Sequence, residues 1–168
     1  MEIFDVFVDK IVKNLPFVPN NSQKTALNLL SRFILEPTMS DRIFVLKGYA
    51  GTGKTSLVGA LVKTMDELKM NTVLMAPTGR AAKVFSAMSG KKAMTIHKTI
   101  YRQEKFNVSF EGFQLMDNRQ KRTLYLCDEA SMISTLNEFS HFGTGNLLDD
   151  LIEYVYAGDQ CRLLLIGD

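Results

Sequence analysis

The segment from Gly48 to Thr55, GYAGTGKT, has the residue types and spacing of a loop that binds phosphate. Its glycines let the backbone curl so that N–H groups point at phosphate oxygens, and a helix starting at the end of the loop adds the positive end of its dipole. We expect Lys54 to reach the β- and γ-phosphates of a nucleoside triphosphate and Thr55 to ligate Mg²⁺. The candidate phosphate-binding residues are Gly48, Ala50, Gly51, Thr52, Gly53, Lys54, Thr55 and Ser56.

The flanks of this loop are those that a phosphate-binding loop needs. Residues 42–47 form a short apolar run rich in β-branched and aromatic residues, and Leu57, Leu61, Met65 and Leu68 recur at helical spacing. The pattern therefore predicts a strand, the loop and a helix in that order. The alternative is a glycine-rich turn between a strand and a helix that binds nothing, and both flanks together count against it.

A pair of carboxylates, Asp128 and Glu129, follows a second apolar run at residues 123–127. Ligands of parallel sheets bind outside the carboxyl ends of the strands, so the pair and the phosphate loop are expected at one edge. We assign Asp128 to the metal ion and Glu129 to the base that accepts a proton from the attacking water. A lone Asp-Glu pair is more often a solvated strand end, but its position after an apolar strand, together with the loop, favours catalysis.

Alternating strand and helix patterns continue along most of the chain and predict an α/β fold with a parallel sheet flanked by helices. A helix with an apolar stripe that starts at Ile3 is expected before Pro16, and Asn21 or Ser22 is expected to cap a second helix that stops near Pro37. Further helices are expected at about residues 54–69, after Arg80 and at 147–156. Strands are expected at residues 43–46, 72–76, 123–127 and 162–166.

Between about residues 103 and 122 the pattern changes to one of alternating aromatic and polar residues. The segments 106–110 and 113–115 alternate on either side of Glu111 and Gly112. We interpret this stretch as a small β-hairpin insertion in the α/β fold.

Length and composition restrict the class of protein further. A chain of 168 residues fits one domain with a real core, and its 20 basic and 18 acidic residues leave only +2, so any contact with nucleic acid must be local. Cys127 and Cys161 have no metal-like spacing and are expected to be buried thiols. The first 15 residues contain scattered charges, unlike a signal peptide, and no apolar run reaches the ~20 residues that span a bilayer, so we expect a cytoplasmic protein with no membrane partner.

Five motifs in order resemble the first RecA-like domain of superfamily 1 helicases. They are GYAGTGKT, APTGRAAK at residues 76–83, TIHK at 95–98, DEAS at 128–131 and LIGD at 165–168. Their order and spacing are most similar to the RecD/Dda-type branch, which moves 5′ to 3′ on single-stranded DNA. The resemblance implies a P-loop NTPase that uses ATP and Mg²⁺, with an N-terminal helix and connector at residues 1–20 and a RecA-like ATP-binding domain at residues 21–168.

The resemblance also implies contacts with the base of ATP and with DNA. Gln23 is similar to the family's glutamine that reads the adenine edge, although it could be an exposed amide at a helix start. The residues that would line the path of single-stranded DNA are Pro77, Thr78, Arg80, Thr95 and His97. A helix start at Thr78 offers N–H groups to a phosphate and Arg80 adds charge. Alternatively, Arg80 belongs to a solvated helix face and His97 to the core.

The hairpin occupies the place of the family's strand-separating pin. An aromatic side chain at its tip could stack on the last base pair, and Phe110 and Phe113 are the candidates. Alternating aromatic residues in a hairpin more often form a small core, and this second interpretation stays open.

The resemblance stops at Asp168, before the family's γ-phosphate-sensing glutamine and before the second RecA-like domain with its arginine finger. Because such an arginine is worth ~10³ to 10⁵ in rate, we expect a fragment that binds ATP better than it hydrolyses it. Missing strands would leave an apolar sheet edge exposed, so we expect the fragment to self-associate.

Two other functions use the same phosphate loop. In a nucleoside or small-molecule kinase, Asp128 and Glu129 would orient a substrate hydroxyl and Arg80 would clamp phosphate. In a non-catalytic nucleotide-gated binding module, ATP would order the loops and alter affinity for a partner.

Overall fold

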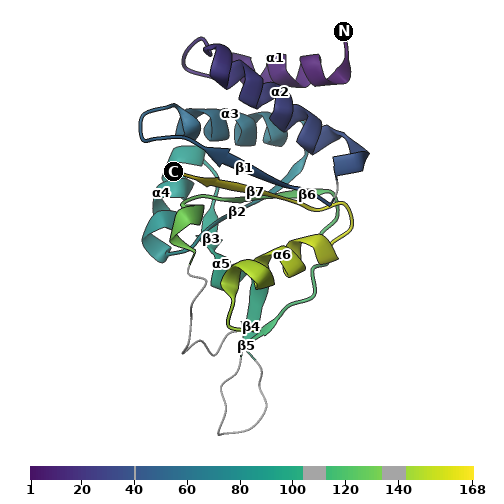
Figure 1. Cartoon of the computed structure of the whole chain (residues 1–168), viewed down its shortest axis with the longest axis vertical. Helices are drawn as coiled ribbons and strands as arrows, with labels where there is room; N and C mark the ends of the chain where they lie inside the picture. Colours follow the sequence, from purple (N-terminus) through teal and green to yellow (C-terminus); the bar gives the residue numbers. More distant parts are fainter. Residues whose placement is uncertain (40, 104–112, 134–142) are drawn as a thin grey trace, which may run out of the picture.

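A parallel sheet forms the centre of the computed structural model, which describes residues 1–39, 41–103, 113–133 and 143–168 (Figure 1). Within these residues the sheet has five strands in the order β1-β7-β6-β2-β3, and every neighbouring pair is parallel. The strands are β1 (Ile43–Lys47), β2 (Asn71–Ala76), β3 (Ala93–Thr95), β6 (Thr123–Cys127) and β7 (Arg162–Gly167). The predicted α/β fold is therefore confirmed.

Helices cover both faces of the sheet, with α1, α2 and α3 stacked on one side and α5 and α6 on the other (Figure 1). Their bounds are α1 (Ile3–Lys13), α2 (Asn21–Leu35), α3 (Lys54–Glu67), α4 (Gly79–Ser89), α5 (Ile96–Ile100) and α6 (Leu147–Ala157), with short 3₁₀ turns at Pro37–Met39 and Ala130–Met132. In β6, Leu124 and Leu126 face the core under α3, while Tyr125 and Cys127 face the core under α6. The central strands read as continuous apolar runs because both of their faces are buried.

The first helix is part of the main core. Phe7 and Ile11 are buried in the same cluster as α3, and the Asn14 amide donates a hydrogen bond of 2.9 Å to the buried Thr64 hydroxyl on α3. Ile3 lies outside the buried stripe, contrary to expectation, because it is the first residue of the helix and is 66% exposed. Residues 1–13 are thus packed onto the α/β unit.

Asn20 caps α2, so the prediction that Asn21 or Ser22 would do so was wrong. The Asn20 side chain accepts the Gln23 N–H at 2.9 Å, and the Gln23 side chain accepts the Asn20 N–H at 2.9 Å. These two reciprocal hydrogen bonds form a capping box between Asn20 and Gln23. At the other end of α2, the buried Arg162 guanidinium donates to the carbonyls of Phe33 and Glu36 and ties the helix to β7.

The sequence patterns missed β3 and α5, which follow α4. Each is too short for a periodic pattern, since β3 has three residues and α5 has five. Their packing explains why they form: Ala93 pairs with Leu74 on β2, and Ile96 and Ile100 are completely buried beneath the sheet.

An antiparallel pair of short strands extends from the α6 side of the sheet. β4 (Tyr101–Gln103) pairs with β5 (Phe113–Leu115), with Gln103 opposite Phe113. The expected strand at residues 106–110 and the turn at Glu111 and Gly112 lie outside the described residues. The described pairing begins earlier in the chain than predicted, at Tyr101.

The buried Asp150 on α6 holds the base of this pair. Its carboxylate accepts hydrogen bonds from the Tyr101 hydroxyl at 2.5 Å, the Thr144 N–H at 3.1 Å and the Thr144 hydroxyl at 2.8 Å. Burial, then the hydrogen bond and charge of Asp150, raise the pKa of the Tyr101 phenol. The N–H of Gly143 also donates to the Phe113 carbonyl at 2.9 Å. One carboxylate therefore joins β4, α6 and the segment that precedes α6.

Both cysteines are free and buried, as predicted. β1 lies at one edge of the described sheet, where Val45 is 55% exposed and Ile43 37% exposed. An apolar sheet edge is therefore accessible. None of the helices within the described residues is long and apolar enough to cross a membrane.

Replacement of Asp150 by alanine should lower the free energy of unfolding by about 1–3 kcal/mol, because Tyr101 and Thr144 lose their buried acceptor. Urea denaturation measures the change. The control is Glu153→Ala on the same helix, which removes an exposed carboxylate and should change stability by less than about 0.5 kcal/mol. Equal losses in the two variants would show that the Asp150 hydrogen bonds contribute nothing specific.

Candidate functional site

The loop from Gly48 to Gly53 curls between the end of β1 and the start of α3. The Gly48 N–H donates to the Gly167 carbonyl at 3.3 Å, which continues the pairing of β1 with β7 into the loop. Gly51 (φ 79°) and Gly53 (φ 86°) have left-handed backbones, and Gly53 is the N-cap of α3. These angles favour glycine, so the glycine spacing seen in the sequence corresponds to a real backbone requirement.

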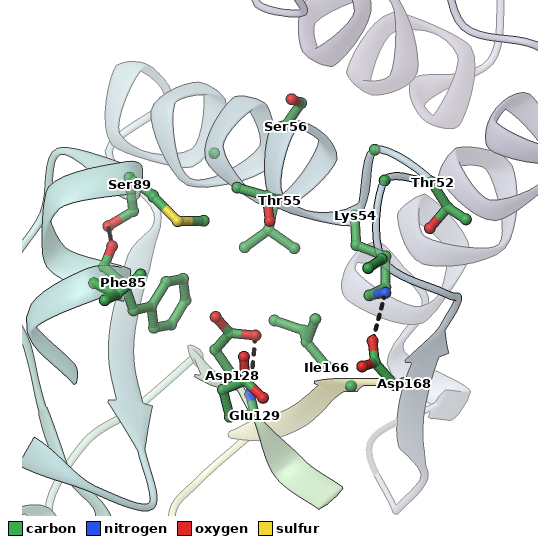
Figure 2. Close-up of a pocket in the computed structure, with 18 of the residues that line it drawn as sticks. Thr52, Lys54, Thr55, Ser56, Phe85, Ser89, Asp128, Glu129, Ile166 and Asp168 are labelled. Carbon is green, nitrogen blue, oxygen red and sulfur yellow. Dashed lines mark hydrogen bonds and ion pairs between the residues drawn. The ribbon is translucent and has the colours of Figure 1, made fainter. Parts of the chain in front are cut away.

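A cavity of about 590 Å³ opens beside this loop. Figure 2 shows Lys54 and Thr55 from the start of α3 on one side, with Asp128 and Glu129 at the end of β6 on the other. The structure thus brings the phosphate loop and the two carboxylates to one cavity, as the sequence predicted. The lining loop residues are Tyr49, Ala50, Gly51, Thr52, Gly53, Lys54, Thr55 and Ser56.

The two carboxylates differ in exposure and backbone. The half-buried Asp128 accepts the Glu129 N–H at 2.9 Å, and its own N–H donates to the Met75 carbonyl on β2 at 3.0 Å. Glu129 is exposed and has a left-handed backbone (φ 54°). For a residue other than glycine this conformation costs roughly 1 kcal/mol or more, and such strain is concentrated at functional sites. The tight turn directs successive carboxylates into the cavity.

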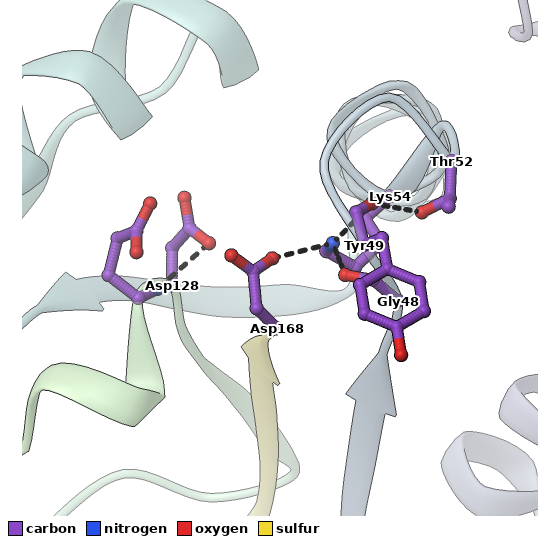
Figure 3. A network of polar contacts seen from close by, with 7 residues as sticks. Gly48, Tyr49, Thr52, Lys54, Asp128 and Asp168 are labelled. Carbon is purple, nitrogen blue, oxygen red and sulfur yellow. Dashed lines mark hydrogen bonds and ion pairs between the residues drawn. The ribbon is translucent and has the colours of Figure 1, made fainter.

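The ammonium group of Lys54 donates hydrogen bonds to three acceptors within the protein. It donates to the carbonyl oxygens of Gly48 and, at 3.1 Å, of Tyr49, and to the Asp168 carboxylate at 3.0 Å. Figure 3 shows Asp168 lying between Lys54 and Asp128. In the sequence Asp168 was only the last letter of a motif, so its contact with Lys54 was missed.

Gln23 contacts the loop itself. Its amide nitrogen donates to the Thr52 carbonyl at 3.0 Å, while its amide oxygen caps α2 through Asn20. Phe17 lines the cavity next to this contact, and a Cβ added to Gly53 would lie 3.3 Å from the Phe17 ring and 2.8 Å from the Gln23 amide nitrogen. Phe17 was missed because it lies in a connector between two prolines without periodicity.

One wall of the cavity is apolar and comes from α4. Val84 (50% exposed) and Met88 (42% exposed) are four residues apart and line the cavity beside Phe85. Val84 thus faces the cavity, whereas its neighbour Phe85 is buried. The spacing of Val84 and Met88 could have indicated a second apolar face on α4.

The residues predicted to line a DNA path lie at the ends of β2 and β3. Ala76 and Thr95 are paired across these strands, so Thr78 and Thr95 begin helices at neighbouring strand ends. Both hydroxyls act as N-caps: Thr78 accepts the Ala81 N–H at 3.1 Å and Thr95 accepts the Lys98 N–H at 3.2 Å. Pro77 is half-buried and Arg80 is exposed. The structure therefore collects these residues on one edge.

His97 and the pin candidates are less accessible. His97 is half-buried, its ring lies 5.7 Å from that of Tyr101, and burial lowers its pKa below 6.5. Phe113 is half-buried against the core under α6, which agrees with the alternative that the hairpin aromatics form a small core. Phe110 lies outside the described residues.

A family model described as an AAA domain matches residues 20–168. The chain belongs to this AAA domain family. The match begins at the cap of α2 and includes the phosphate loop, Asp128, Glu129 and Asp168.

Curated relatives of this AAA domain include two named helicases. It is 35% identical over 117 residues to the ATP-dependent DNA helicase dda of Enterobacteria phage T4, with 66% of this chain and 25% of the relative covered. It is 31% identical over 154 residues to the ATP-dependent RecD2 DNA helicase of Deinococcus radiodurans, with 90% of this chain and 19% of the relative covered. The sequence resemblance to RecD/Dda-type superfamily 1 helicases is thereby confirmed, and the chain spans a quarter or less of these two relatives.

A solved structure of the Pif1 helicase from Candida albicans is also similar to this AAA domain. The similarity has a TM-score of 0.48 and 20% sequence identity, and it covers 90% of this chain and 33% of the Pif1 chain.

The lowered pKa of His97 predicts a titration midpoint below 6.5 in the folded protein, measured from the imidazole proton resonances by NMR. Since the unfolded pKa is about 6.5, protonation at lower pH favours unfolding, and the contribution of His97 to stability should fall as the pH drops below 6.5. A His97→Gln variant assigns the signal, because the chain has only one other histidine, His141. A midpoint at or above 6.5 would contradict the burial of this ring.

Proposed function

We propose that this AAA domain is the ATP-binding motor domain of an ATP-dependent DNA helicase. The observation that carries the proposal is the convergence of Lys54, Thr55, Asp128 and Glu129 on one cavity at the carboxyl edge of a parallel sheet. Phosphoryl transfer requires chiefly positioning and electrostatic stabilisation, and these residue types supply both. The names of the phage T4 and Deinococcus relatives support a helicase in preference to other users of the loop.

The loop residues fit a triphosphate. The left-handed angles of Gly51 and Gly53 curl the loop at the N-terminus of α3, where backbone N–H groups and the helix dipole favour anions. The proposed ATP contacts are those of Gly48 and of the segment 50–56, with Lys54 as the cation. Gln23 reads the adenine edge in this proposal, and its contact with Thr52 keeps its amide next to the loop.

Thr55 and Asp128 are the oxygen donors that would hold Mg²⁺, which prefers hydroxyl, carboxylate and phosphate oxygens. The ion would neutralise charge on the phosphates. Glu129 is the proposed base, because it lines the cavity and is exposed there.

We propose that single-stranded DNA crosses the ends of β2 and β3. The helix starts at Thr78 and Thr95 and the exposed Arg80 suit phosphate oxygens, and Pro77 and His97 complete this edge. At pH 7 His97 would act as a neutral hydrogen-bonding group, because burial lowers its pKa. Phe110 and Phe113 remain the proposed pin residues, and movement from 5′ to 3′ is proposed from the family resemblance.

A second RecA-like domain is the proposed partner of the cavity, since an arginine that stabilises the transferred phosphate would have to come from it. We further propose that this chain by itself self-associates through the exposed β1 edge, where Ile43 and Val45 are accessible. Light scattering at high protein concentration measures this, and a monomeric mass would contradict it.

The nucleotide assignments predict different effects of two substitutions. Lys54→Ala should weaken ATP binding by at least about tenfold, because it removes the cation that faces the phosphates. Glu129→Gln should leave ATP binding within about twofold and lower ATP turnover of the proposed full-length helicase by about 100-fold or more. Calorimetry measures binding, and phosphate release in the presence of single-stranded DNA measures turnover.

Three outcomes would count against these roles. Turnover that survives Glu129→Gln would remove Glu129 as the base. Turnover stimulated by a nucleoside and indifferent to single-stranded DNA would favour a kinase. Tight ATP binding by a full-length protein whose function does not depend on Glu129 would favour a nucleotide-gated binding module.

Binding of an unstructured oligonucleotide should weaken with salt, because released counterions drive contacts with phosphates. Arg80→Ala should reduce the slope of log K against log salt by about 0.7 if Arg80 meets one phosphate. The control is Lys13→Ala, an exposed cation in the last turn of α1 and outside the proposed DNA edge, which should leave the slope unchanged. Equal effects of the two substitutions would refute the proposed DNA edge.

A further inference from the structure

We propose that Asp168 is an internal counter-ion that holds Lys54 when no nucleotide is bound, and that nucleotide phosphate must displace it. This inference rests on the proposed nucleotide-binding function. It assigns to Asp168 a role in positioning Lys54, and it makes the end of β7 sensitive to occupancy of the phosphate loop.

The first argument is the number of donors on Lys54. An ammonium group has three N–H donors and no acceptor. All three have partners in the structure: the carbonyls of Gly48 and Tyr49 and the carboxylate of Asp168 (Figure 3). A phosphate that binds Lys54 must therefore replace at least one of these partners.

The second argument identifies Asp168 as the partner that is replaced. The carbonyls of Gly48 and Tyr49 belong to the backbone of the loop that surrounds the phosphates, whereas Asp168 reaches Lys54 through a rotatable side chain from the end of β7. The Lys54 side chain is only 15% exposed and stays in place. Once phosphate takes Lys54, the Asp168 carboxylate is next to a like charge, which favours its departure. Exchange of one anion for another keeps Lys54 neutralised throughout.

The third argument concerns what Asp168 is attached to. Gly167, the preceding residue, pairs with Lys47 in β1 and accepts the Gly48 N–H, so it joins β7 to the phosphate loop. On its other side, a Cβ added to Gly167 would lie 3.4 Å from the Ser131 N–H, in the turn that follows Glu129. Asp168 thus extends from a position between the loop and the carboxylates. When nucleotide arrives and Asp168 is released, the end of β7 changes. By thermodynamic linkage, a change at the end of β7 must in turn alter the affinity for nucleotide.

Asp168→Asn and Asp168→Ala test the competition. Both should bind ADP and ATP about two- to tenfold more tightly than the unsubstituted chain, because an exposed ion pair and a nearby like charge no longer oppose the phosphates. Calorimetry with each nucleotide measures the dissociation constant. Glu153→Gln makes the same change in net charge at an exposed position of α6 and should leave the affinity unchanged.

A second measurement needs no nucleotide. An amine-reactive acylating reagent followed by mass spectrometry gives the rate of modification of Lys54, with the exposed Lys63 of α3 as internal reference. Asp168→Ala should raise the Lys54 rate relative to Lys63 by about two- to tenfold, because one of three hydrogen-bonding partners is lost. Glu153→Gln should leave the ratio unchanged.

The two measurements together decide between explanations. Faster labelling of Lys54 with unchanged or weaker nucleotide affinity would overturn the competition between Asp168 and phosphate. Tighter nucleotide binding with unchanged labelling would assign the effect to general charge and overturn the Lys54 pair. Failure of the unsubstituted chain to bind either nucleotide would instead refute the proposed function. The ratio of Lys54 to Lys63 labelling rates would still test the ion pair.

Discussion

Parallel pairing of the strands is the constraint on which the rest of the structure depends. Because β1, β2, β3, β6 and β7 all run in one direction, the residues that follow them come out at one edge. The phosphate loop, Asp128 and Asp168 directly follow a strand, Glu129 and Thr78 lie two positions beyond one, and Thr95 is the last residue of β3. Segments more than a hundred residues apart in the chain therefore share one surface without any motif that spans them.

The sequence located most reliably the residues whose type is required by the local backbone conformation or by their position after a buried strand. Gly51 and Gly53 are needed for left-handed angles, and Asp128 follows a strand buried on both faces, so type and spacing were sufficient. The sequence could not predict β3, since three residues give no alternation, or the contacts of Gln23 and Asp168 with the loop. Those contacts join residues 29 and 114 positions apart, and only the folded sheet brings them together.

Several polar side chains that were candidates for ligand contacts already have partners within the protein. Gln23 both caps α2 and holds the loop at Thr52, while Thr78 and Thr95 both cap helices. A hydroxyl that accepts an N–H can still donate its own proton, so these caps remain compatible with phosphate binding. For the Gln23 amide, reading adenine requires rearrangement of contacts that exist already.

β1 is an edge strand of the described sheet, and this position affects how readily it unfolds locally. β1 has one hydrogen-bonded neighbour, β7, whereas β6 is held between β7 and β2 and is buried throughout. Local opening takes least free energy where neighbours are few and side chains exposed. The phosphate loop therefore follows an edge strand, which opens more readily than the central β6, and a ligand that bridges the loop to Asp128 would link this edge to the centre of the sheet. Binding of that ligand would slow the exchange of the β1 backbone amide protons with solvent.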